Sequence, residues 1–106
     1  MRRFALRHGY RFPVFGPVKY ERANREGYGT VMNVSSFGWR VSGSLLLEPG
    51  DVCSLNVKLA PKTWVSVAAG KVRWVRGEEC GIETLVINEL SEARLNAYIL
   101  ERVKAL

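Results

Sequence analysis

The sequence is poor in the residues from which metal sites and disulfide frameworks are built. Its 106 residues include two cysteines, Cys53 and Cys80, and one histidine, His8. The cysteines do not form a CxxC pair, and a structural zinc site usually takes four ligands. We therefore expect no metal ion and no disulfide. We expect both thiols to be reduced and to behave as half-buried small hydrophobes.

Long apolar runs are also missing. A membrane-spanning helix needs about 18 consecutive apolar residues, and no stretch of the sequence approaches that length. The start, MRRFALRHGY, has the charge that opens a signal peptide, but Arg7 interrupts the apolar residues before a hydrophobic region develops. These absences predict a cytoplasmic protein without a membrane span.

Enzyme chemistry is not indicated either. We find no carboxylate pair, no nucleophile with a base and no phosphate-binding glycine loop. What the sequence does have is basic charge, with 16 Lys and Arg against 10 Asp and Glu and a formal net charge of +6. This balance favours binding of an anionic partner such as a nucleotide, a nucleic acid or a phospholipid surface.

Apolar residues alternate with polar ones along most of the chain, and Gly or Pro interrupts the alternation every eight to twelve residues. This pattern is typical of a small antiparallel barrel. A glycine in the middle of the long fifth segment, Gly70, suggests the bulge by which a strand turns a barrel corner. The six predicted strands are FPVFGPVKYER, YGTVMNVSS, GWRVSG, LEPGDVCSLNVKL, TWVSVAAGKVRWVRG and CGIETLVI.

The last part of the chain has a different period. Leu95, Ile99, Val103 and Leu106 recur at helical spacing and form one apolar stripe. We therefore predict a mainly β protein, a six-stranded antiparallel β-barrel over residues 12–87 with a C-terminal α-helix over residues 90–104. The whole chain, 1–106, forms one domain, and residues 1–11 are expected to be a flexible basic segment.

A polar triplet ends the second predicted strand. Strict alternation places Met32 and Val34 in the core, and Asn33 and Ser35 side by side on the outer face with Val31. An amide next to a hydroxyl can bind a planar edge that carries both donors and acceptors. Gly38 suits a backbone with positive φ or close approach of a ligand. The alternative is an ordinary turn rich in Asn, Ser and Gly.

Two arginines, Arg7 and Arg11, lie four residues apart on either side of Gly9. A guanidinium group can bind phosphate with two hydrogen bonds and can also stack on an aromatic base. The pair therefore suits a ligand that has phosphates and purine faces. The alternative is a solvated basic tail, since Arg2 and Arg3 are close by.

Both elements, in this order, resemble the PilZ domain family. Arg7-His-Gly-Tyr-Arg11 matches the RxxxR motif of the family, and Asn33-Val-Ser-Ser-Phe-Gly38 matches its (D/N)xSxxG motif. FPV after the second arginine and GKVRWVRGEECGIETL add to the similarity, which covers about residues 7 to 85. A second RxxxR match begins at Arg3, but FPV follows only the match at Arg7.

The resemblance implies a six-stranded barrel that binds cyclic di-GMP, a bacterial second messenger, in signalling that regulates motility or biofilm formation. In the family, the residues that match Arg7 and Arg11 contact the phosphates and stack on guanine. Those that match Asn33 and Ser35 bind a guanine edge, and the glycine that matches Gly38 leaves room. No cofactor is implied beyond this ligand. The signal would pass to an unidentified protein partner or to a fused domain.

Three further residues are candidates for ligand contacts. Arg3 belongs to the alternative arginine pair, and Arg40 is expected to be exposed because Trp39 and Val41 face the core. Trp74 either borders the ligand and stacks on it or fills the barrel core.

Two other functions remain open. The first is a PilZ-like protein-interaction module that does not bind cyclic di-GMP. The second, less favoured, is a basic β-barrel for single-stranded nucleic acid, since the chain is basic and has Trp39, Trp64 and Trp74 as possible stacking residues. The tryptophans are scattered at positions where alternation buries many of them, and we expect no DNA partner.

Overall fold

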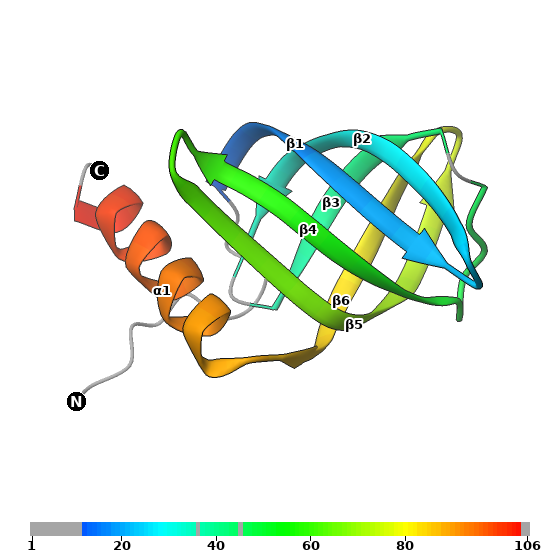
Figure 1. Ribbon diagram of the computed structural model, residues 1–106. Helices are drawn as coiled ribbons and strands as arrows, with labels where there is room; N and C mark the ends of the chain where they lie inside the picture. Colours follow the sequence, from blue (N-terminus) through cyan, green and yellow to red (C-terminus); the bar gives the residue numbers. More distant parts are fainter. Residues whose placement is uncertain (1–11, 36, 45, 105–106) are drawn as a thin grey trace.

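Strands make up most of the computed structural model, which describes residues 12–35, 37–44 and 46–104. The predicted ligand contacts Arg3, Arg7 and Arg11 lie outside these ranges. Figure 1 shows the order of the elements along the chain, β1 (Phe12–Arg22), β2 (Arg25–Val34), β3 (Gly38–Gly43), β4 (Val52–Ala60), β5 (Thr63–Arg76), β6 (Glu79–Ile87) and α1 (Glu89–Lys104).

These strands close into a barrel in the order β1-β2-β3-β6-β5-β4, and each neighbouring pair is antiparallel. The barrel is closed by the pairing of β1 with β4. In this pair, Val18 to Glu21 lie opposite Val57 to Ser54. The predicted mainly β fold, a six-stranded antiparallel barrel with a C-terminal helix, is confirmed. A closed barrel leaves few unpaired backbone groups along its wall, so ligands and partners must use side chains or the ends of the barrel.

The barrel core is built from alternate residues of every strand, as the sequence pattern predicts. In β4, for example, Cys53, Leu55, Val57 and Leu59 are buried while the residues between them are partly exposed. The free thiols of Cys53 and Cys80 are both buried, and burial raises the pKa of each to about 11. Both thiols are therefore protonated at neutral pH and are poor nucleophiles.

Bulges interrupt the alternation at particular places. Gly70 lies at one of the register shifts between β5 and β6, as predicted. In β2, Val31 pairs with Val41 and Asn33 pairs with Arg40, so Met32 is the extra residue of a bulge.

The bulge in β2 changes which side chains face the core. Val31 is fully buried and Met32 only partly buried, so the prediction that Met32 lies in the core and Val31 outside is wrong. Val34 is buried, as predicted. Ser35 is 1% exposed, so its predicted place on the outer face is also wrong. The chain leaves the strand at Ser35 and turns toward β3.

Helix α1 packs at the end of the barrel where β5 begins (Figure 1). Asn88 precedes the helix, and its Oδ1 accepts a hydrogen bond of 2.7 Å from the backbone N–H of Ser91. Ser91 Oγ in turn accepts the N–H of Ser66 on β5 at 3.0 Å. Leu95 and Ile99 lie one and two turns further along the same face and are buried. Asn88 is thus the N-cap of the helix, in a register that directs its apolar face to the barrel.

Replacing Asn88 with alanine removes this cap. We predict that N88A lowers the free energy of unfolding by about 1 kcal/mol, because the N–H of Ser91 loses its partner. Urea denaturation followed by circular dichroism measures the change. The matched control is N96A, which removes the same side chain from an exposed position within the helix and is expected to raise stability slightly, because alanine has the higher helix propensity. Equal stability of N88A and the wild type would contradict the assignment of the cap.

Candidate functional site

Four residues form a row across the outer face of the barrel. Asn33 on β2 pairs with Arg40 on β3, Arg40 pairs with Gly81 on β6, and Gly81 pairs with Trp74 on β5. Directly paired residues of neighbouring strands place their side chains on the same face of a sheet. Three inter-strand steps of roughly 4.8 Å make the row about 14 Å long. We call these four residues the outer row.

Gly81 lets Trp74 lie flat across the barrel wall. A Cβ atom added to Gly81 would lie 2.1 Å from Nε1 of Trp74, so the indole occupies the space that a side chain would fill. The guanidinium of Arg76 lies 5.6 Å from the centre of the indole ring. Trp74 is half-buried, on the outer face rather than in the core. The alternative of a core tryptophan is therefore wrong, and contact of Trp74 with a ligand stays a prediction.

Two arginines of this face are paired with glutamates. Nε and Nη2 of Arg40 donate to the same carboxylate oxygen, Oε1 of Glu79, at 2.8 and 2.5 Å. Arg73 donates from Nε to Glu83 at 2.6 Å. The Arg40 side chain is 43% exposed, so the predicted exposure of Arg40 is confirmed. Because each of these two arginines already has an anion, it attracts a phosphate only weakly.

Ser35 and Gly38 hold the turn between β2 and β3. The N–H of Ser35 donates to the carbonyl of Gly38 at 3.0 Å, and Ser35 Oγ accepts the N–H of Phe37 at 3.2 Å. The carbonyl of Phe37 accepts the N–H of Thr84 on β6, which ties the turn to the barrel. The buried Ser35 hydroxyl therefore fixes the turn that follows Asn33.

Gly38 is needed for packing against β6. A Cβ atom at this position would lie 2.5 Å from the carbonyl oxygen of Ile82. The backbone of Gly38 does not have a positive φ. Within the described ranges, positive φ values occur at Ala23, Asn24, Gly50 and Gly77. Close approach of two strands, rather than a special backbone conformation, thus accounts for glycine here.

The chain upstream of β1 begins beside the outer row. Pro13 pairs with Asn33, and Phe12 pairs with Val34. An extended chain covers at most about 3.5 Å per residue, so the length of chain from Phe12 to Arg7 is sufficient to span roughly 17 Å. Both Arg7 and Arg11 are therefore within reach of the row by chain length alone.

The residues that the structure describes include no group of three or more His, Cys, Asp or Glu placed to hold a metal ion. Within the same residues, no helix has the length and apolar character needed to cross a membrane. The outer row offers an amide, a guanidinium and an indole, which are groups that bind a planar, anionic organic ligand.

Two residues of this site were not identified from the sequence. Gly81 forms the floor between Arg40 and Trp74, and Glu79 pairs with Arg40. Their roles follow from strand register. The signal that was available is the glycine in the predicted sixth strand, because a glycine within a strand often marks a close approach by another group.

Filling the space at Gly81 displaces Trp74. We predict that G81A moves tryptophan fluorescence emission to longer wavelength and lowers the free energy of unfolding by about 1 kcal/mol, because the indole must leave the barrel wall. The control is the same substitution in a W74F background, where the emission is expected to stay unchanged. An unshifted spectrum of G81A would show that Trp74 does not lie on Gly81.

Comparison with solved structures shows that the whole chain has a known fold. The structure of the Bacillus subtilis inhibitor of motility (MotI/DgrA) superposes with a TM-score of 0.77 and 19% sequence identity over 99% of this chain. This chain spans 54% of the length of that protein. The PilZ domain of CeSA from a cellulose-synthesizing bacterium superposes with a TM-score of 0.66 and 13% identity, covering 89% of this chain and 97% of that one.

The sequence comparisons agree with this fold. No curated protein matches the chain by sequence. The family model of the PilZ domain matches residues 3–101, which include both motifs and nearly the whole chain. PilZ domains are binding and adaptor modules rather than enzymes. The chain therefore belongs to the PilZ domain family.

Proposed function

We propose that this PilZ domain is a receptor for cyclic di-GMP and that the ligand binds over the outer row, between Asn33 and Trp74. The observation that carries the proposal is the pairing of Pro13 with Asn33. It places the residues that directly follow the arginine-bearing segment beside the second motif. The two motifs are 22 residues apart in the sequence, from Arg11 to Asn33, and Pro13, two residues after Arg11, pairs with Asn33.

The distribution of charge supports phosphate binding by Arg7 and Arg11. Four of the 16 basic residues and none of the 10 acidic ones lie in residues 1–11, so this segment carries +4 of the net charge of +6. The barrel and helix are nearly neutral. Since Arg40 is held by Glu79, its guanidinium can only share its remaining N–H groups with a phosphate. Most of the phosphate contact energy must then come from Arg7 and Arg11, with Arg3 as a further contact.

Guanine recognition is assigned to Asn33 and Trp74. The Asn33 amide offers both an acceptor and donors to the edge of the base, and the indole of Trp74 offers a flat face for stacking. The buried Ser35 contributes by holding the turn after Asn33, a positioning role that differs from the direct contact expected from the family motif. Gly38 keeps β3 close to β6, so that Arg40 lies in register with Asn33.

We further propose that binding orders residues 2–11 across the barrel and presents a new surface to a partner protein or fused domain. Ordering costs conformational entropy, which offsets part of the contact energy and predicts roughly micromolar affinity. The process is cytoplasmic second-messenger signalling. Motility is one candidate for the regulated process, because the similar protein MotI/DgrA carries the name inhibitor of motility.

The barrel is less suited to single-stranded nucleic acid. A groove that follows a nucleic-acid backbone needs unpaired positive charge, yet Arg40 and Arg73 on the outer face are paired with glutamates. Trp39 is fully buried and is not available for stacking.

Calorimetric titration tests the proposal. We expect wild-type protein to bind cyclic di-GMP saturably and to show no saturable heat with GMP. R7A and R11A each lose a charged hydrogen bond to phosphate and are expected to bind at least tenfold more weakly. N33A is expected to weaken binding severalfold, because guanine loses an edge contact.

The matched control is R25A, which removes an exposed arginine at the far end of β2. R25A lowers the net charge by the same amount as R7A or R11A but removes no proposed phosphate contact. It is therefore expected to bind cyclic di-GMP within twofold of the wild type. If the wild type gave no more heat with cyclic di-GMP than with GMP, the proposal would be wrong and the domain would be an interaction module that does not use this ligand.

A further inference from the structure

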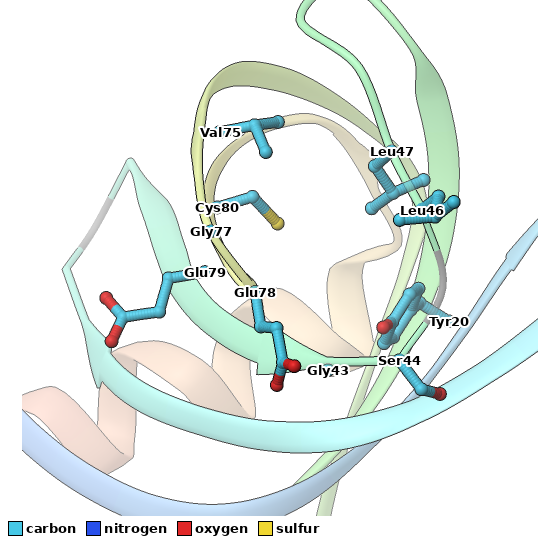
Figure 2. A pocket seen from close by; sticks show the side chains of 10 residues that line it. All are labelled: Tyr20, Gly43, Ser44, Leu46, Leu47, Val75, Gly77, Glu78, Glu79 and Cys80. Atoms are coloured by element: carbon cyan, nitrogen blue, oxygen red, sulfur yellow. The ribbon is translucent and has the colours of Figure 1, made fainter.

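A cavity of about 320 Å³ opens at the end of the barrel opposite to Gly38. It lies between the C-terminal end of β3, the segment that follows it and the hairpin that joins β5 to β6 (Figure 2). The N–H of Gly43 donates to the carbonyl of Glu78 at 3.0 Å, which holds the hairpin against the end of β3. The cavity is therefore part of the barrel framework. None of the four residues of the outer row lines it, although Glu79, the partner of Arg40, does.

Part of the wall of the cavity is apolar. Tyr20, Leu47 and Cys80 are buried residues that form its inner part. Leu46 and Val75 lie at its mouth and are 92% and 37% exposed. Leu46 is therefore apolar surface beside the cavity that this domain does not use for its own packing.

The unpaired charge at the mouth is acidic. Within the described part of the chain, the carboxylate of Glu78 has no ion-pair or hydrogen-bond partner, and Glu48 next to Leu47 is also exposed. In Figure 2 the Glu79 side chain points away from the cavity, consistent with its pairing with Arg40.

Two of the basic residues near this end of the barrel have partners. Arg22 pairs with Asp51 at 3.0 Å, and Arg76 lies over Trp74 on the outer face. The mouth of the cavity thus combines apolar side chains with the unpaired carboxylate of Glu78.

We propose that this cavity is a docking site for a protein partner that presents an apolar side chain next to a lysine or arginine. The apolar side chain would fill the space between Leu46, Leu47 and Val75, and the cation would pair with Glu78. A volume of about 320 Å³ is at the lower limit for a small-molecule site and is sufficient for one large side chain. The inference does not depend on cyclic di-GMP, because the outer row and this mouth use different residues.

Titration of ¹⁵N-labelled protein with the peptide acetyl-Lys-Leu-Lys-amide tests the proposal. We expect saturable chemical shift changes at the amides of Gly43, Gly77 and Cys80. Acetyl-Lys-Gly-Lys-amide lacks the apolar anchor and acetyl-Glu-Leu-Glu-amide has the opposite charge. Both are expected to bind at least tenfold more weakly.

Two variants locate the site. L46S removes apolar surface at the mouth, and because Leu46 is 92% exposed the fold is expected to be unaffected. We expect about tenfold weaker binding of acetyl-Lys-Leu-Lys-amide, as burial of a leucine side chain is lost. The matched control is L90S, which changes a leucine that is 62% exposed on α1, and is expected to bind as the wild type does.

The proposal would be overturned if L46S bound this peptide as tightly as the wild type, or if the three peptides bound equally. It would also be overturned if analytical ultracentrifugation showed self-association that L46S abolishes, because this face would then be an interface between two copies of the chain.

Discussion

The pairing of β3 with β2 on one side and with β6 on the other is the constraint on which the candidate site depends. Only this arrangement places Arg40 between Asn33 and Gly81. Two glycines allow it, since a side chain at Gly38 would meet the Ile82 carbonyl and one at Gly81 would meet Trp74. The same close approach that stabilises the barrel therefore also shapes the surface that we assign to the ligand.

Much of the fold could be predicted from the sequence, because alternation reports which side of a strand faces the core. It correctly placed Trp39 inward and Arg40 outward, and Gly70 correctly indicated a break in the fifth strand. Alternation failed where a bulge adds a residue. An extra residue at Met32 turned Val31 inward.

The candidate site shows the same limit. Trp74 lies two residues after the buried Val72, so strict alternation directs it to the core. The register shift between Val72 and Trp74 instead places it on the outer face beside Gly81. A bulge is a property of a pair of strands, because it depends on the register between them. It cannot be predicted from the sequence of one strand alone. The motifs could be found because their chemistry is local, whereas the residues around them, Gly81 and Glu79, come from another strand.

The central claim is that the outer row binds cyclic di-GMP. The most direct measurement is a ¹⁵N–¹H spectrum of the labelled protein recorded during titration with this ligand. We expect the largest shifts at the amides of Asn33, Arg40 and Gly81 and at the indole N–H of Trp74, while the amide of Arg25, at the opposite end of β2 from Asn33, stays unchanged. Largest shifts at Arg25, with the outer row unaffected, would contradict the account.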